Sequence, residues 1–436
     1  MLGSTRSPYL LRRLPARMTA LLRAVGRLAD GQGVRVYLVG GVVRDLLLRR
    51  VNLDLDLAVE GDGIALARRV SARFHTSLTV FDRFATARLQ FPDGLRMDIA
   101  TTRRESYAQP AELPTVKPAT LGEDLYRRDF TINAMAVQLN GEQVGRLIDD
   151  YGGQKDLRTR TIRVLHERSF EDDPTRIFRA IRFEQRFKGH FEPRTKRLLR
   201  EAAGTALIDR LSGPRLCNEW FLIFAEQDPA HAIERLGRLK LLRFLHPHLQ
   251  YGVSIRRMIR ALPKALAWWA RRFPTSSIDR SVLYLMALLE GMSESVVEGV
   301  ITRLMLPNAQ ARKVRSTGKK LAALASRLAR PARLQPSEVY HSLICLPDEA
   351  LALMIAKSMT GKKVADVSRT QQQVSCFVTQ LRDAKTTLRG DDLVRMGLKP
   401  GPGIKVVLTR LLNARLDGGL KTGADERGFV RKLVRA

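Results

Sequence analysis

Two aspartates at alternating positions of a short apolar run are the residues best placed to do chemistry. In Leu53-Asp54-Leu55-Asp56-Leu57 a strand would put the leucines on one face and the two carboxylates on the other. Carboxylates held side by side repel each other unless a cation lies between them, and Mg²⁺ prefers carboxylate oxygens together with substrate phosphates. The alternative is a half-exposed strand whose polar face happens to be acidic. The sequence just upstream favours a metal site.

A glycine pair precedes the aspartates. Gly40 and Gly41 follow the strand-like run Val36–Val39 and open a helical run, Val42–Arg49. Glycines let a backbone approach a ligand closely, and a helix start offers free N–H groups to phosphate. Arg44 can add a charged fork to the same phosphates. A plain strand-to-helix turn is the simpler interpretation of the glycines alone.

A third carboxylate, Asp98, lies in the strand-like run Leu95–Ala100 and shares a face with Arg96. Asp98 can complete a metal site with Asp54 and Asp56, or it can simply pair with an arginine. The residue types leave both alternatives open.

Adjacent arginines mark the next segment. Arg127 and Arg128 lie between Asp124 and Thr131, residues that cap helices well. Arginine forks clamp phosphate, and the capping residues would order a helix start beside them. A surface salt-bridge cluster is the alternative.

A basic helix start follows. Pro174 suits the first helical position, so Asp173 is a natural cap. The arginines of this helix recur every third residue, at positions Arg176, Arg179 and Arg182. Asp173 and Arg176 lie about one turn apart and can offer one acceptor and several donors to a base edge, in place of a template. An amphipathic helix with a capping aspartate is the alternative.

The elements that must position these groups change character along the chain. Residues 34–150 alternate short strands with helices, including a hairpin of Ala87–Phe91 and Leu95–Ala100, a loop at 107–120 and a helical pattern after Glu123. From Asp172 onward nearly everything is helical. A basic helix, Pro15–Asp30, precedes the strands, and its apolar stripe predicts a core face rather than a targeting segment. The pattern indicates a small α/β head on a long helical body.

Charge and cysteine content narrow the partners. Lys and Arg number 75 against 44 Asp and Glu among 436 residues, a formal charge of +31 that indicates a nucleic-acid partner. The three cysteines are far apart, which predicts neither a disulfide framework nor a zinc site and fits the cytoplasm. No apolar run approaches the roughly 18 to 20 residues of a membrane span, so no membrane association is expected.

Taken together, these motifs resemble a known family. Their order, Gly-Gly-x-x-Arg-Asp, Asp-x-Asp, Arg-Arg-Asp-Phe-Thr-Ile-Asn-Ala and Asp-Asp-Pro-x-Arg-x-x-Arg-Ala-x-Arg-Phe, is similar to class II tRNA nucleotidyltransferases and bacterial poly(A) polymerases. The likeness is strong over 34–250 and resumes at 390–402 and 414–418, which favours the tRNA enzymes. Arg49 stands where the family commonly has a glycine.

The resemblance implies an α+β fold and a set of roles. A nucleotidyltransferase head with a five-stranded mixed sheet (31–165) would follow the N-terminal helix (1–30) and precede a helical neck (166–250), body (251–385) and tRNA-binding tail (386–436). Asp54 and Asp56 would bind Mg²⁺, and Asp98 is a further catalytic candidate. The nucleotide-binding residues would be Gly40, Gly41, Arg44, Arg127, Arg128, Asp173, Arg176, Arg179 and Arg182.

The implied reaction adds C, A or both to a tRNA 3′ end from CTP and ATP, with release of pyrophosphate. The residues of some motifs are most similar to those of a branch of the family whose members include enzymes that add only A or only CC. Partial activity is therefore one expectation. A poly(A) polymerase acting on other RNA, and a non-catalytic basic RNA-binding protein, are the alternatives.

Overall fold

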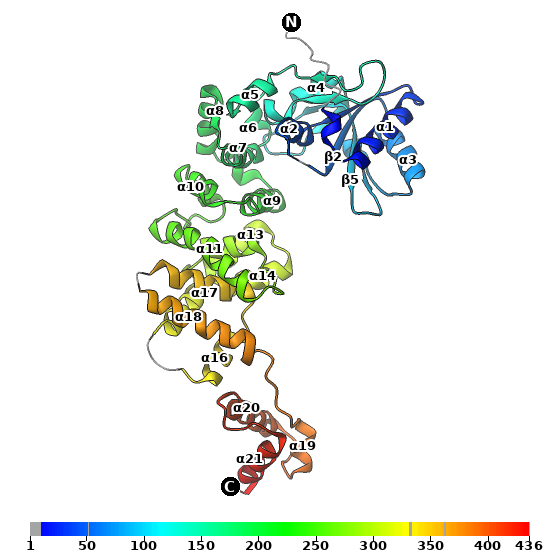
Figure 1. The fold of residues 1–436 in the computed structure, drawn as a ribbon. Helices are drawn as coiled ribbons and strands as arrows, with labels where there is room; N and C mark the ends of the chain where they lie inside the picture. Colours follow the sequence, from blue (N-terminus) through cyan, green and yellow to red (C-terminus); the bar gives the residue numbers. More distant parts are fainter. Residues whose placement is uncertain (1–9, 51, 331–333, 362, 436) are drawn as a thin grey trace. The chain divides into compact units, whose positions relative to one another are not determined.

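The chain combines a mixed β-sheet with many helices, which confirms the predicted α+β class (Figure 1). The structure is a computed structural model that describes residues 10–50, 52–330, 334–361 and 363–435. The backbone divides into two compact units, residues 1–219 (unit 1) and 220–436 (unit 2). The boundary falls within helix α9 (Gly213–Phe224). The finer division into head, neck, body and tail stays a prediction.

The main sheet of unit 1 has seven strands in the order β3-β4-β5-β2-β1-β8-β9, so the expectation of five strands is wrong. Only β2 and β5 run parallel, and the other neighbours are antiparallel. The strands are β1 (Arg35–Val39), β2 (Asp54–Glu60), β3 (Ser77–Phe81), β4 (Thr86–Gln90), β5 (Arg96–Thr101), β8 (Ala136–Gln138) and β9 (Leu147–Ile148). The hairpin predicted around Pro92-Asp93-Gly94 is confirmed by the β4–β5 pairing.

Two sequence expectations fail next to the sheet. The helical pattern after Glu123 ends at Tyr126, and the chain then enters β8, whose three residues are all buried and so show no alternation. The loop expected at 107–120 contains β7 (Thr115–Pro118), which pairs with β6 (Arg103–Ser106). A second small sheet joins β10 (Thr161–Ile162) and β11 (His190–Phe191).

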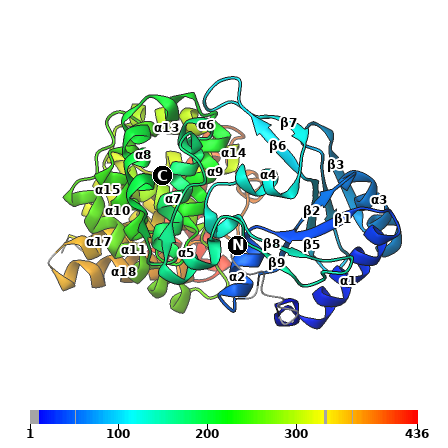
Figure 2. The same cartoon turned by 90° about the horizontal axis from the view of Figure 1, so that it is seen from above.

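The two faces of the sheet have separate cores. Val36 and Leu38 of β1 and Leu55 and Leu57 of β2 pack on one face against helices α1 (Ala16–Asp30), α2 (Gly41–Leu47) and α3 (Gly63–Phe74). The alternate residues of β1, together with Ala58, pack on the opposite face against α4 (Leu121–Tyr126), as Figure 2 shows. Because side chains alternate along a strand, Asp54 and Asp56 lie on the α4 face.

Two details of the predicted elements are now settled. The first basic helix exists as α1, and its Leu21, Leu22 and Val25 are buried in the core, as its stripe predicts. Leu53, by contrast, is 57% exposed, because β2 begins only at Asp54, so only two leucines of the run reach the core.

The remaining helices follow from Gly153 onward. Those of unit 1 are α5 (Gly153–Thr159), α6 (Ser169–Asp172), α7 (Thr175–Arg186) and α8 (Pro193–Gly204). Those of unit 2 are α10 (Ala230–Arg238), α11 (Val253–Arg272), α12 (Arg280–Leu288), α13 (Glu294–Leu304), α14 (Asn308–Arg315), α15 (Lys319–Leu328), α16 (Pro336–Leu343), α17 (Asp348–Thr360), α18 (Val364–Cys376), α19 (Gly390–Arg395), α20 (Pro402–Leu416) and α21 (Gly423–Arg435).

Unit 2 is built around α17. This helix packs against α11, α12, α15 and α18, and its residues from Glu349 to Ala356 are all buried. Helices α19, α20 and α21 form a separate small core around Leu393, Leu411 and Val430. Among the described residues no single helix is long and apolar enough to cross a membrane, although the bent pair α16 and α17 passes that test by length and composition.

Arg49 occupies a backbone conformation that suits glycine. Its φ is +58°, just after α2, where the resemblance expects a glycine. A side chain in this left-handed conformation costs about 1 kcal/mol relative to glycine. We therefore expect Arg49→Gly to raise the melting temperature by a few degrees, measured by thermal unfolding, and Arg49→Val to lower it. An unchanged melting temperature for both variants would contradict a strained Arg49.

Candidate functional site

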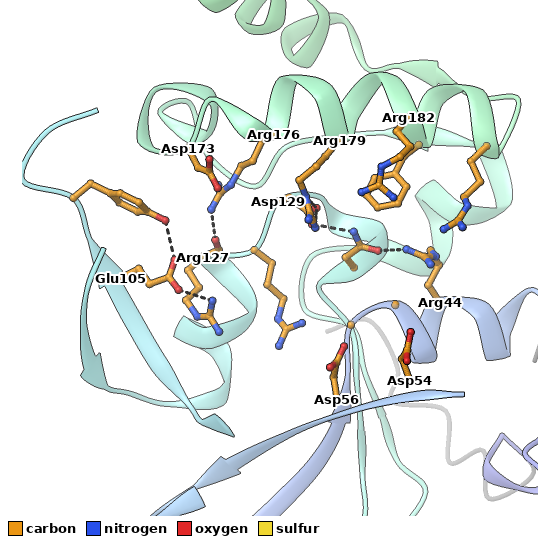
Figure 3. Close-up of a pocket in the computed structure, with 17 residues that line it drawn as sticks. Arg44, Asp54, Asp56, Glu105, Arg127, Asp129, Asp173, Arg176, Arg179 and Arg182 are labelled. Carbon is orange, nitrogen blue, oxygen red and sulfur yellow. Dashed lines mark hydrogen bonds and ion pairs between the residues drawn. The ribbon is translucent and has the colours of Figure 1, made fainter. Parts of the chain in front are cut away.

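A polar cavity of about 610 Å³ in unit 1 gathers nearly every residue singled out by its chemistry. Asp54 and Asp56 from β2 lie on one side, and arginines of α7 line the other (Figure 3). We call it the arginine pocket. Its lining residues are Gly40, Gly41, Arg44, Asp54, Asp56, Glu105, Tyr107, Arg127, Arg128, Asp129, Asn133, Asp173, Arg176, Arg179, Arg182, Phe183 and Arg186.

The two carboxylates of β2 differ in their surroundings. The Asp54 side chain is 69% exposed, and its ion-pair partner is Arg96, at 3.3 Å. Asp56 is also exposed to solvent, but more of the protein surrounds its carboxylate. Partial burial raises the pKa of Asp56 to about 6, the carboxylates of Asp98 and Asp54 add to the rise, and Arg128 opposes it. Burial is the larger cause of this rise in pKa and the neighbouring negative charge the smaller one, and a bound cation would oppose both.

Asp98 lies beside Asp56 on the neighbouring parallel strand but is engaged elsewhere. Nε and Nη2 of Arg88 donate to its two oxygens, each at 2.8 Å. Asp98 is also outside the lining of the arginine pocket. Of the two alternatives for Asp98, pairing with an arginine is the one present, and its role as a third catalytic carboxylate stays a prediction. Within the described ranges no three Asp, Glu, His or Cys side chains form a group that could hold a metal.

The glycine turn is shaped by Arg128. Gly40 has a φ of +76°, and a Cβ atom there would lie 2.9 Å from Nη1 of Arg128, so the guanidinium rests directly on the turn. Nη2 of Arg128 donates to Asp124 at 2.9 Å. Its Nε is buried without a hydrogen-bond partner among the described residues. Arg128 therefore has unused donor capacity between the glycine turn and Asp56.

Arg44 lines the pocket, and three of its five N–H donors are used within the protein. Its side chain is only 4% exposed, and it donates to both oxygens of Asp45 and to Oδ1 of Asn133, the last at 2.6 Å. Burial lowers the pKa of Arg44, and Asp45 counters part of that effect. The guanidinium also lies over the ring of Phe183, 5.3 Å from its centroid. The second N–H groups of Nη1 and Nη2 are not used in these hydrogen bonds, and the contact of Arg44 with the nucleotide stays a prediction.

One end of the pocket, which we call the wall, is formed by Arg127 together with Glu105, Tyr107 and Arg176. Nη1 of Arg127 donates to Glu105 at 2.7 Å, and its Nη2 donates to Asp124 at 2.8 Å. Tyr107 donates its hydroxyl to the other oxygen of Glu105, and burial together with Glu105 raises the pKa of Tyr107. Nη2 of Arg176 donates to the carbonyl of Arg127 at 2.7 Å. These contacts hold the wall in one conformation.

The prediction that Asp173 is the N-cap of α7 is wrong, because the helix begins at Thr175 and Pro174 is its N-cap, but Oδ1 of Asp173 still accepts from the Thr175 backbone N–H at 3.0 Å. The same oxygen accepts from Arg215, whose other nitrogen donates to the carbonyl of Ala111. All the hydrogen bonds that the described residues donate to Asp173 end on Oδ1, so Oδ2 is available to a ligand. Arg176 is buried, and its Nη1 donates to Ser169 at 2.8 Å.

The arginines of α7 that recur every third residue, Arg176, Arg179 and Arg182, all line the pocket. Arg179 makes a short ion pair with Asp129 at 2.6 Å. Arg182 lies over the ring of Phe183 and has Glu219 at 3.8 Å.

Sequence reasoning missed several residues of the pocket. Glu105 and Tyr107 belong to β6 and the turn after it, and nothing in their spacing points to a site. Asn133 and Asp129 lie within the Arg-Arg-Asp-Phe-Thr-Ile-Asn-Ala motif, so their motif membership was the available signal. Arg186 continues the α7 stripe one turn beyond Arg182.

Comparisons with known proteins agree with this arrangement. Residues 36–163 match the family described as the poly A polymerase head domain, and residues 190–252 match a family described as the probable RNA and SrmB-binding site of polymerase A. The A-adding tRNA nucleotidyltransferase of Geobacter sulfurreducens is 40% identical over 97% of this chain. The match covers 48% of that relative, so this chain spans about half its length.

Two solved structures are similar along the whole chain. A CCA-adding enzyme in an apo form has a TM-score of 0.83 and 34% identity, with 100% of both chains covered. The Thermotoga maritima CCA-adding enzyme complexed with tRNA has a TM-score of 0.78 and 32% identity, also over 100% of both chains. Nucleotidyltransferases of this family generally use divalent metals. With its motifs in place around one pocket and its likeness unbroken from end to end, this chain belongs to the class II tRNA nucleotidyltransferase family.

Proposed function

We propose that this protein adds C, A or both to the 3′ end of tRNA without a nucleic-acid template. The terminal hydroxyl of the RNA attacks the α-phosphate of CTP or ATP, a new phosphodiester bond forms, and pyrophosphate leaves. The observation that supports this proposal best is the arrangement of the arginine pocket, where Asp54 and Asp56 face the arginines of α7 across one cavity. The carboxylates on one side of the cavity could then bind a metal ion, and the arginines on the other side could bind the triphosphate that accompanies it.

Mg²⁺ is the metal we propose for Asp54 and Asp56. Two carboxylates on one strand face, one with a raised pKa, are a suitable oxygen donor set for a hard divalent cation. When bound, such a cation supplies charge stabilisation to the reacting phosphate and lowers the pKa of the attacking hydroxyl. We propose that Arg128 and the backbone of Gly40 and Gly41 hold the triphosphate, and the support is that the Arg128 guanidinium lies against the Gly40 turn.

Base selection is the role we propose for Asp173 and Arg176. Oδ2 of Asp173 can accept from the exocyclic amino group that cytosine and adenine share, whereas uracil and guanine lack a donor at that position. Arg176 is held by Ser169 and the Arg127 carbonyl, so its remaining N–H groups have a fixed direction. Arg179 and Arg182 would support the base and the triphosphate from the same helix face.

Selectivity tests this role for Asp173. We expect Asp173→Ala to reduce the ratio of kcat/KM for ATP or CTP over UTP about tenfold, because a half-buried acceptor that reads the base is lost. Asp173→Ser is the matched variant, since serine also accepts from the Thr175 N–H but lacks the second oxygen. If Asp173→Ser kept full selectivity, Asp173 would only stabilise the start of α7 through its hydrogen bond with Thr175.

The number and kind of nucleotides added are resolved by one assay. Labelled ATP and CTP are offered, separately and together, with tRNA that lacks CCA, CA or A. The Geobacter relative carries the name A-adding, which supports incorporation of A onto tRNA ending in CC and little use of CTP. The CCA-adding structures support use of both nucleotides. Long A-tails without use of CTP would identify a poly(A) polymerase instead.

A non-catalytic RNA-binding protein is the alternative from a different class. Carboxylates that face a phosphate backbone weaken binding unless a cation lies between, so Asp54 and Asp56 argue against it. Function that persists without divalent metal would support that alternative. The cytoplasm is the compartment we propose, because the free Cys217, Cys345 and Cys376 suit a reducing environment.

A further inference from the structure

A second cavity of unit 1, about 890 Å³, lies on the other side of the wall formed by Arg127 and its partners. We call it the tyrosine cup. It shares four residues with the arginine pocket, namely Glu105, Tyr107, Arg127 and Arg176. Three consecutive residues connect the two cavities. Tyr126 lines the cup, Arg127 lines both cavities, and Arg128 lines the arginine pocket.

Three rings form one side of the cup. The Tyr126 ring lies 5.8 Å from Tyr151 and 5.4 Å from His166, both tilted relative to it. Tyr126 is nonetheless 47% exposed, so a large part of its ring faces solvent. Burial lowers the pKa of His166 to about 4, and Arg176 and Arg168 add to the effect, so its imidazole is neutral at pH 7. Neutral imidazole can both donate and accept at the edge of a bound group.

The charges around the cup are nearly balanced. Five arginines and four carboxylates line it, and several are paired, as in Arg194 with Glu167 at 2.7 Å and Arg168 with Asp172 at 3.4 Å. Arg104 also lines the cup, and no carboxylate of the described residues lies within ion-pair distance of it. A triphosphate needs several unpaired cationic side chains around it, whereas one phosphodiester needs only one such side chain. The cup therefore suits a flat base that carries one phosphodiester.

We propose that the tyrosine cup binds an unpaired base near the 3′ end of the RNA substrate, stacked on Tyr126, with its phosphodiester near Arg104. Exposed aromatic rings beside arginines are the usual means by which proteins hold single-stranded RNA. This inference rests on the proposed function, because the RNA end must reach the arginine pocket next door. An occupied cup would also fix Arg127 and Arg176, which belong to both cavities.

The test uses the full chain and an RNA stem whose unpaired 3′ tail carries 2-aminopurine, a base whose fluorescence falls when it stacks. Wild type and Tyr126→Phe, which keeps the ring, should quench this fluorescence. Tyr126→Leu should lose most of the quenching and raise KM for the RNA about tenfold, the usual loss for one stacked base, with kcat and KM for the nucleotide unchanged. Val144→Ala, another exposed apolar position of unit 1, is the control and should behave as wild type.

A second variant and a competing probe complete the design. Arg104→Gln should reduce the dependence of RNA affinity on salt by about one phosphate contact. If Tyr126→Leu quenches and binds RNA as wild type does, the inference is wrong. It is also wrong if free 2-aminopurine riboside triphosphate quenches in a Tyr126-dependent way, since the cup would then hold nucleotide. Nucleotide incorporation by wild type, measured in parallel, shows separately whether the proposed function holds.

Discussion

Asp54→Ala is expected to abolish nucleotide addition while leaving the fold and RNA binding intact. The Asp54 side chain is 69% exposed, and its ion pair with Arg96 is open to solvent. Such exposed pairs contribute roughly 0 to 1 kcal/mol to stability, so the folded state has little need of this carboxylate. Asp54 places a second negative charge next to Asp56 and adds little to the stability of the fold. A cation bound between the two carboxylates would explain this arrangement.

The size of the loss follows from the chemistry. A cation at a reacting phosphate supplies several kcal/mol of charge stabilisation, and about 4 kcal/mol corresponds to a rate about 10³-fold slower. The measurement is single-turnover incorporation of labelled nucleotide into truncated tRNA, with tRNA affinity measured separately. Glu142→Gln removes another exposed carboxylate of unit 1 and should behave as wild type. Normal turnover by Asp54→Ala would remove the basis for the proposed metal site.

Much of the site could be predicted because its motifs are local. A strand that alternates leucine and aspartate assigns its own faces, and the structure places Asp54 and Asp56 on the side opposite Leu55 and Leu57. The recurrence of arginine at every third position of α7 is likewise a property of one helix and is visible in the sequence. The left-handed Arg49 is also where the sequence departs from the family pattern.

What could not be predicted depends on contacts between distant segments. Strand β8 has three buried residues and no alternation, so its place beside β1 is visible only in the folded sheet. The hydrogen bond that Nη1 of Arg44 donates to Asn133, 89 residues away, is likewise invisible in the sequence. Asp98 is a different case, because Arg88 lies opposite it in the predicted hairpin, and only the register of β4 and β5 shows that the two residues pair.

Asp129→Ala is expected to produce the largest loss of stability among the pocket residues. Asp129 is 6% exposed, and its Oδ2 accepts from Nε and Nη2 of Arg179 at 2.8 and 2.6 Å. Its Oδ1 accepts from Asn133, which in turn accepts from Arg44. Asp129 thereby joins α7 to α2 through one network. Its removal leaves Arg179 and Asn133 without their partner inside the protein, which costs about 3 kcal/mol.

The effect of pH gives an independent check on the same residue. Burial alone would raise the pKa of Asp129, but the ion pair with Arg179 and the hydrogen bond from Asn133 overcome it and hold that pKa at about 2. Because the folded pKa lies below the ordinary value of 3.8, ionised Asp129 stabilises the fold fully above about pH 4. That contribution is lost as pH falls toward 2.

Thermal unfolding of wild type and Asp129→Ala across this range measures both effects. At neutral pH the melting temperature of the variant should be lower by roughly 6 to 12 °C, given about 2 to 4 °C per kcal/mol for a unit of this size. The difference between the two proteins should then narrow as pH falls below 4, because wild type loses what the variant already lacks. Glu142→Gln again serves as the control. A difference that stays constant down to pH 2 would mean that the charge of Asp129 contributes nothing, and that only its packing holds α7 against α2.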